Sequence, residues 1–175
     1  SDELQKSSEQ QLAEKLYNEA IANYQRKKSE LSKQSLPVFK NIRLTQGNHI
    51  ENVIVPFNDG KKNMQVLANM QKTLDSNGAE LGNALERGVT LGLIDDAWKE
   101  HLRAMDDLKQ SVQTATYEQK DPLVIYKMEA FEMFRKMDLS INHQLVQFLC
   151  HAHIPLEGSN VKEGKQQKTD LSKLS

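Results

Sequence analysis

Two groups of side chains in this sequence have the residue types that catalytic and metal sites use. The first lies in DAWKEHLRAMDDL, residues 95–107, where His101 directly follows Glu100. A histidine beside a carboxylate can serve as an acid/base pair, but consecutive residues on a helix point about 100° apart and do not act together on one substrate atom. The sequence therefore predicts a histidine that is packed or hydrogen-bonded at a helix contact, not a general base.

The second group has the residue types of metal ligands. Cys150 and His151 are adjacent, His153 follows, and His143 precedes them by about two helical turns. Structural zinc needs four ligands that converge on one point, and a helix cannot direct adjacent Cys and His side chains toward the same ion. We therefore expect a small buried thiol beside solvated histidines, with a metal-dependent enzyme as the alternative.

The other candidate groups have ordinary structural explanations. Four carboxylates near His101 predict exposed salt bridges with neighbouring Lys and Arg side chains, and four methionines fall at the spacing of core positions. Neither DGKK nor EGKQQ has the glycine and Ser/Thr positions of a phosphate-binding loop. We therefore predict no catalytic, cofactor-binding or metal-binding residue in this chain. The carboxylates are Asp95, Asp96, Asp106 and Asp107, their partners Lys99, Arg103 and Lys109, and the methionines Met105, Met128, Met133 and Met137.

The composition excludes several classes of protein. The 23 Lys and Arg residues nearly balance the 24 Asp and Glu residues, so the bulk charge attracts neither nucleic acid nor anionic lipid. The single cysteine cannot form an internal disulfide, which is typical of a reducing, cytosolic setting. No apolar run reaches the roughly 20 residues of a membrane-spanning helix, so we expect a soluble chain. Because it opens at Ser1 without an initiator methionine, we expect a part of a longer protein.

The hydropathy pattern predicts a helix and then a β-hairpin in the first part of the chain. Apolar residues spaced by three and four indicate an amphipathic helix, which Pro37 should interrupt with a bend before Gly47 ends it. Residues 49–68 predict a β-hairpin, because the Asp-Gly of NDGK supplies the positive φ angles of a tight turn. Pro56 should then lie at a strand end or on an outward edge, and the ribbon must pack on a neighbouring helix. The apolar helix residues are Leu12, Leu16, Tyr17, Ala20, Ile21, Tyr24 and Leu31.

Two further helices are predicted after the β-hairpin. Helical periodicity continues over residues 70–112 and predicts one long helix. Its glycines would be close-contact sites for a partner helix or places where it bends, with Gly78 as the expected position of a break; they are Gly78, Gly82, Gly88 and Gly92. Asp121 and Pro122 have the residue types of a helix cap and first helical position, so the second helix should start there and end before residue 155. Two helices joined by a short loop pack antiparallel. The fold class is therefore mainly α, with elongated helices, an antiparallel helical hairpin and a small β-hairpin insertion.

One set of residues has the order and spacing of a known family. It consists of Ile94, Asp95, WKEHL at 98–102, Met105, Asp106, Tyr117, QKDP at 119–122, Tyr126, Lys127, Phe131 and Phe134. With these positions, residues 93–134 closely resemble the helical scaffold region of SecA, the motor subunit of the bacterial preprotein translocase. IANYQRKK, residues 21–28, resembles the last part of the SecA helical wing domain.

The resemblance covers most of residues 12–155 and implies three parts. Residues 1–88 would be part of the wing domain, with the β-hairpin at about 49–68 as an insertion. Residues 89–155 would be the scaffold part with its two-helix finger. Residues 156–175 are polar and would be a disordered linker or tail.

The resemblance also implies a mechanical, non-catalytic function. In SecA the loop of the two-helix finger enters the SecY channel and touches the translocating polypeptide, while the scaffold helix braces the nucleotide-binding domains. It implies SecYEG, preproteins and the nucleotide-binding domains of the same chain as partners, a cytoplasmic location at the inner membrane, and ATP with Mg only in the full-length protein. The implied finger-tip contacts are Thr114, Ala115, Thr116, Tyr117, Gln119 and Lys120, and the implied contacts with the motor domains are Trp98, His101, Leu102 and Met105.

The sequence also departs from the family pattern. The finger tip of SecA commonly reads Leu-Arg-Gly-Tyr, whereas this chain has Thr114, Ala115, Thr116 and Tyr117 and so has no arginine there. A stand-alone helical adaptor is the alternative to a SecA fragment, and the full reading frame would distinguish the two. Exposed apolar stripes could also pair two copies of an isolated fragment into a homodimer.

Overall fold

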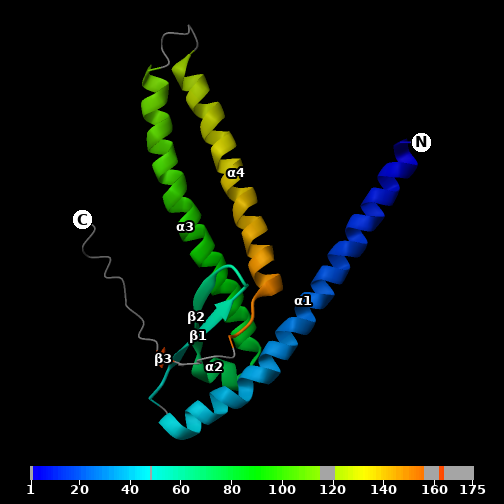
Figure 1. The fold of residues 1–175 in the computed structure, drawn as a ribbon, viewed down its shortest axis with the longest axis vertical. Helices are drawn as coiled ribbons and strands as arrows, with labels where there is room; N and C mark the ends of the chain where they lie inside the picture. The colour runs from blue at the N-terminus through cyan, green and yellow to red at the C-terminus, as the bar shows by residue number, and fades with distance from the viewer. Residues whose placement is uncertain (1, 48, 115–120, 156–161, 164–175) are drawn as a thin grey trace. The chain divides into compact units, whose positions relative to one another are not determined.

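The computed structural model describes residues 2–47, 49–114, 121–155 and 162–163. Its elements are α1 (Asp2–Gln46), β1 (Asn52–Asn58), β2 (Asn63–Asn69), α2 (Met70–Asp75), α3 (Ala79–Thr114), α4 (Pro122–His151) and β3 (Lys162–Glu163) (Figure 1). The predicted fold class, mainly α with a small β-hairpin, is confirmed. The chain separates into two compact units. The first contains Ser1–Phe57, Met64–Leu85 and Ile154–Ser175, and the second contains Asn58–Asn63 and Glu86–His153.

α1, in the first unit, continues through Pro37, so the interruption predicted there is wrong. A proline inside a helix removes one hydrogen bond and costs roughly 3 kcal/mol. Packing around the proline offsets this cost, because Ser35 before it and Phe39 and Ile42 after it are buried. A bend at Pro37 stays a prediction. The helix ends, as predicted, just before Gly47, which has a positive φ of 79°.

The first half of α1 has an exposed apolar stripe. Each of residues 8–23 is exposed, including Leu12, Leu16, Tyr17 and Ile21. The three-and-four spacing of these residues correctly predicted the helix. In the described part of the chain the same residues do not form a core.

The β-hairpin forms from β1 and β2 as predicted, and β3 extends it to the order β2-β1-β3. Side chains alternate along β1, so that Val53, Val55 and Phe57 are buried. This buried face meets α1, because Val53 and Val55 line one groove together with Phe39 and Ile42. The predicted packing of the ribbon on a helix is confirmed.

Hydrogen bonds along β1 explain the position of Pro56. Asn58 exchanges two backbone hydrogen bonds with His153, each of 2.9 Å, and Ile54 is paired with Lys162 of β3. Alternate residues of an antiparallel strand face the same edge. Pro56 therefore faces the edge away from β2, where its missing N–H removes nothing from the β1–β2 ladder. β3 and His153 pair with β1 on this same side, so β1 is the central strand and the predicted strand end or outward edge is wrong.

β3 lies within the segment predicted to be a disordered tail, residues 156–175. Its two residues pair with Val53 and Ile54 of β1. The other residues of that segment lie outside the described part of the chain.

The break predicted at Gly78 separates α2 from α3. Asn77 and Gly78 have φ angles of 51° and 89°, which are incompatible with a continuous helix. Asn69 caps α2, because its side chain accepts a hydrogen bond of 2.9 Å from the amide of Lys72. Gly78 also lies against α1, since a Cβ at this position would be 2.6 Å from the carbonyl oxygen of Ser32. One glycine thus provides both the break and a close contact with α1.

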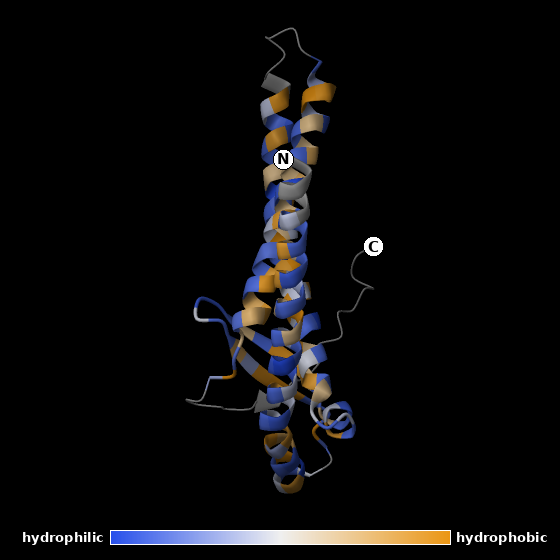
Figure 2. Cartoon of the chain, turned by 90° about the vertical axis from the view of Figure 1, so that its right-hand side faces the viewer, coloured by the Kyte–Doolittle hydropathy of each residue, from blue (hydrophilic) through white to orange (hydrophobic). Residues whose placement is uncertain are grey.

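The second unit is built on the helical hairpin of α3 and α4, which lie side by side (Figures 1 and 2). The chain reverses between the end of α3 at Thr114 and Pro122, so the helices are antiparallel, as predicted. Asp121 caps α4, because its Oδ1 accepts a hydrogen bond of 2.9 Å from the amide of Leu123. Pro122 begins the helix, and α4 ends at His151. The predicted helix start is confirmed.

The turn between β1 and β2, Asn58–Asn63, belongs to the second unit. The Oδ1 of Asp59 accepts hydrogen bonds from the amides of Lys61 and Lys62, at 2.8 and 2.6 Å. Gly60 has a φ of 90°, as expected for an Asp-Gly turn. Burial alone would raise the pKa of Asp59, but the hydrogen bonds from the amides of Lys62 and Lys61 lower it, and the net pKa is below its ordinary value of 3.8.

Replacing Asp59 with asparagine is expected to remove a pH-dependent part of the stability. Because the pKa of Asp59 is lower in the folded chain, its charged form stabilises the fold above the unfolded pKa, and this contribution is lost as the pH falls through the folded pKa. The free energies of unfolding of the wild type and Asp59→Asn, measured by urea titration from about pH 6 to pH 3, should therefore converge at the acid end. A constant difference over this range would contradict the assignment.

Candidate interaction surface

An aromatic cluster joins the two helices of the hairpin. On α3 the rings of Trp98 and His101 have centroids 5.5 Å apart. The His101 ring also meets Phe134 of α4 edge-on, at 6.0 Å and an interplanar angle of 70°. Both distances are in the favourable range for ring pairs. His101 is therefore a packed residue at a helix contact, as predicted.

Next to this cluster, small residues lie on the side of α3 that packs against α4. We call this side of α3 the seam. Ala97 and Ala104 are half-buried, and Leu93 and Leu108 are buried. Four larger apolar residues on the same stretch of α3 lie on its solvent-facing side and are 44–67% exposed. We call this set the outer stripe; it consists of Leu91, Ile94, Trp98 and Leu102.

The four residues predicted to contact motor domains are divided between the seam and the outer stripe. Trp98 and Leu102 are exposed, whereas His101 and Met105 are half-buried. The four share one helical face, because they are spaced by three and four residues. The structure therefore brings together the predicted residues as a surface that is partly held by α4. Contact with other domains through this surface stays a prediction.

Hydrophobic and charged residues alternate around the outer stripe. Figure 2 shows hydrophobic residues interspersed with hydrophilic ones along both helices. Lys99 donates a hydrogen bond of 2.5 Å to Asp95, which raises the pKa of Lys99 above its ordinary value of 10.5. Arg103 lies 3.7 Å from Glu100. The predicted salt bridge between Asp95 and Lys99 is confirmed, whereas Arg103 lies beside Glu100, which was not among its predicted partners. Both pairs are exposed and contribute little stability.

The contact of Phe134 with His101 was not predicted from the sequence, in which Phe134 is only one of the positions that resemble the family. The sequence nevertheless indicates this contact. Two antiparallel helices rise by the same distance per residue, so residues at nearly equal distances from the connecting loop lie opposite one another. His101 lies thirteen residues before the last residue of α3, Thr114, and Phe134 lies twelve residues after the first residue of α4, Pro122.

The predicted finger-tip residues fall almost entirely outside the described chain. Thr114 is the last residue of α3. The remaining five, Ala115, Thr116, Tyr117, Gln119 and Lys120, lie outside the described residues. Their roles stay predictions.

The cysteine and histidines near residue 150 do not have the predicted arrangement of a buried thiol beside solvated histidines. Cys150 is exposed, so the predicted buried thiol is wrong; the side chain lies on the outer side of the last turn of α4. The Nδ1 atoms of His151 and His153 lie 2.9 and 3.2 Å from the carbonyl oxygens of Gln147 and His151. Among the described residues, no group of three or more His, Cys, Asp or Glu side chains could hold a metal ion.

The methionines predicted to be core residues are only partly so. Met105, Met133 and Met137 are half-buried, but Met128 is 66% exposed. Met128 is five and nine residues from Met133 and Met137, which places it about 140° and 180° away from them around the helix. The helical period itself therefore puts Met128 on the other face of α4, and the predicted core spacing is wrong for this residue.

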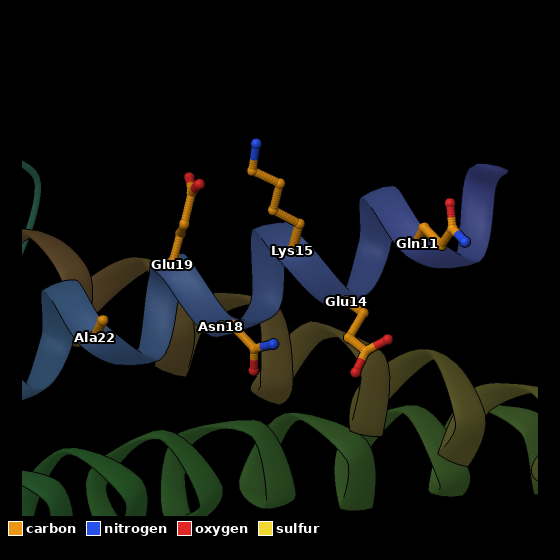
Figure 3. A pocket seen from close by; sticks show the side chains of 6 residues that line it. All are labelled: Gln11, Glu14, Lys15, Asn18, Glu19 and Ala22. Carbon is orange, nitrogen blue, oxygen red and sulfur yellow. The ribbon is translucent and has the colours of Figure 1, made fainter.

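A concave surface on α1 does not form an enclosed ligand site. It is lined by Gln11, Glu14, Lys15, Asn18, Glu19 and Ala22, which all belong to one helix. Figure 3 shows Lys15 and Glu19 projecting from one side of α1 and Glu14 and Asn18 from the other. Ligand sites normally bury most of the ligand between several elements.

Among the described helices, none is long and apolar enough to cross a membrane.

The helical hairpin, its exposed apolar stripe and the β-hairpin define a helical scaffold that offers contact surfaces. Residues 1–153 match the family described as the SecA wing and scaffold domain, and the chain belongs to this family. The predicted family is therefore confirmed.

Relatives named protein translocase subunit SecA cover nearly the whole chain. The relative from Cytophaga hutchinsonii is 43% identical over 169 residues, which are 96% of this chain and 15% of that protein. The relative from Christiangramia forsetii is 42% identical with the same coverage, and the one from Bacteroides thetaiotaomicron is 37% identical over 97% of this chain and 15% of that protein. The chain thus spans about 15% of the length of these curated relatives. No solved structure matches it.

Proposed function

We propose that this chain is the non-catalytic scaffold and finger part of a SecA motor that drives preproteins through the SecYEG channel. The observation that carries the proposal is the antiparallel hairpin of α3 and α4, joined by the contact of His101 with Phe134, in a chain of the SecA wing and scaffold family. Its partners would be SecYEG, preproteins and the nucleotide-binding domains of the same protein, at the cytoplasmic side of the inner membrane.

The outer stripe supports a contact with other domains. Leu91, Ile94, Trp98 and Leu102 lie on one side of α3 and are 44–67% exposed. Exposed apolar side chains in a row are typical of a surface that a partner covers. The alanines at the seam allow α4 to pack without using these larger side chains. The nucleotide-binding domains are the partner we propose for this stripe, with ATP and Mg bound there and not by this chain.

If the hairpin moves as a rigid body, a movement at the outer stripe is transmitted to the loop after Thr114. A helix of 30 residues such as α4 is about 45 Å long. A shift imposed on α3 near the outer stripe would therefore be carried to the loop after Thr114. Tyr117, in that loop, offers an aromatic side chain that can contact polypeptides of varied sequence.

Replacing Tyr117 with alanine in the full-length protein tests this function. We expect preprotein export to fall about tenfold, which corresponds to the loss of one aromatic contact of about 1.4 kcal/mol, while ATP binding stays unchanged. Export into membrane vesicles and nucleotide titration measure the two effects. Tyr117→Phe is the matched control, because it keeps the aromatic ring and should leave export unchanged. Equal export by the wild type and Tyr117→Ala would contradict the finger-tip role.

A stand-alone adaptor is not favoured. The relatives are translocase subunits, and the matching segment is about 15% of each of them.

A further inference from the structure

We propose that the turn of the β-hairpin, Asn58–Asn63, is a latch that holds the carboxyl end of α4 at the base of the helical hairpin. The turn and the hairpin belong to the same compact unit. The inference concerns the fold and does not depend on the function proposed above. It gives a role to the turn of the β-hairpin.

The latch is ordered by its own hydrogen bonds. The side chain of Asn58 accepts a hydrogen bond from the amide of Gly60 and donates one to Asn63. The Oδ1 of Asp59 accepts hydrogen bonds from the amides of Lys61 and Lys62. These contacts join both ends of the turn and fix its central residues. Little further ordering is therefore needed when the turn contacts another element.

The first contact of the latch lies just beyond the end of α4. Asn58 and His153 exchange two backbone hydrogen bonds of 2.9 Å. His153 follows Ala152, the C-cap residue of α4, whose amide donates a hydrogen bond of 2.7 Å to the carbonyl of Phe148. Ala152 and Phe148 are both buried. The pairing with Asn58 therefore fixes the chain at the point where α4 ends.

The second contact lies on α4 itself. The Nζ of Lys62 donates a hydrogen bond of 2.6 Å to the Oε1 of Gln144, a residue 82 positions later in the chain. The same side chains line a small groove of about 190 Å³ together with Leu93 of α3 and Phe148 of α4. The latch thus contacts α4 and shares a groove with Leu93 of α3 at the base of the hairpin.

Two separated contacts restrain α4 more than one would. A single contact would let the helix pivot, whereas contacts before and after the C-cap oppose both pivoting and fraying. The restraint matters because α4 is a lever of about 45 Å. A change of about 5° at its base would displace the other end by about 4 Å.

Hydrogen exchange of the whole chain tests the latch. Lys62→Met should increase the exchange rates of the amides of residues 147–151 about three- to tenfold, the effect of losing one hydrogen bond. Exchange in residues 126–136, in the first half of α4, should not change. Lys136→Met, at an exposed position of α4, is the matched control and should leave both regions unchanged.

Two further variants separate the contact from a general loss of stability. Lys62→Arg keeps a donor and should retain the protection of residues 147–151. Gln144→Leu also removes the 3.0 Å hydrogen bond from its Nε2 to Ser140, so it should raise exchange at least as much as Lys62→Met. The double variant should exchange no faster than Gln144→Leu, because the bond between Lys62 and Gln144 is already lost in it. Unchanged exchange in Lys62→Met, additive effects in the double variant, or a uniform increase along α4 would each overturn the latch.

Discussion

Replacing Gly78 with alanine is expected to lower the free energy of unfolding by about 2 to 5 kcal/mol. Gly78 has a φ of 89°, which costs a residue with a Cβ roughly 1–2 kcal/mol. The added Cβ would also lie 2.6 Å from the carbonyl oxygen of Ser32 and 3.0 Å from its Cα. These are backbone atoms of α1, so a packed helix must shift, which adds about 1–3 kcal/mol. Urea denaturation followed by circular dichroism measures the change.

Gly60→Ala is the matched control for this prediction. Gly60 has nearly the same φ, 90°, but a Cβ at that position meets nothing within 4 Å. Its replacement should therefore cost only the conformational strain, about 1–2 kcal/mol. Equal losses for the two variants would show that the close approach of α1 to Gly78 is not present in the folded chain.

The sequence predicted the elements better than the contacts between them. The break at Gly78 and the cap at Asp121 follow from local preferences of glycine, aspartate and proline, and both are present. The helix through Pro37 was missed, because burial of Phe39 and Ile42 against β1 outweighs the local cost of proline. A glycine in a helical pattern indicates a close contact or a bend, but the sequence does not show that α1 is the helix that approaches Gly78.

For the candidate surface, too, the sequence predicted the helical face but not the contacts that the face makes. The three-and-four spacing on α3 correctly placed Trp98, His101 and Leu102 on one face. Which of them face α4 depends on the register of the hairpin, and Phe134 could have been found from its distance to the loop. The contact of Lys62 with Gln144 could not, since two polar side chains 82 residues apart carry no pattern in a single sequence.

Replacing Phe148 with alanine is expected to cost about 3–5 kcal/mol, the usual loss when a fully buried phenylalanine is truncated. Phe148 is 1% exposed and lies at the base of the hairpin, near the groove that Leu93 and Lys62 also line. The cavity left by its ring would be bounded by α3, α4 and the latch. Because the latch and the seam both hold this region in place, the surrounding side chains have little freedom to fill the cavity. The midpoint of urea denaturation gives the loss of stability.

Phe131→Ala is the control on the same helix. Phe131 is 63% exposed, so its truncation removes little buried surface and should cost less than about 1 kcal/mol. The two variants delete the same atoms from α4, and their difference measures packing at the base of the hairpin alone. A loss for Phe148→Ala as small as that for Phe131→Ala would mean that the base is not packed around Phe148. The carboxyl end of α4 would then lack the buried core that the latch is proposed to hold in place.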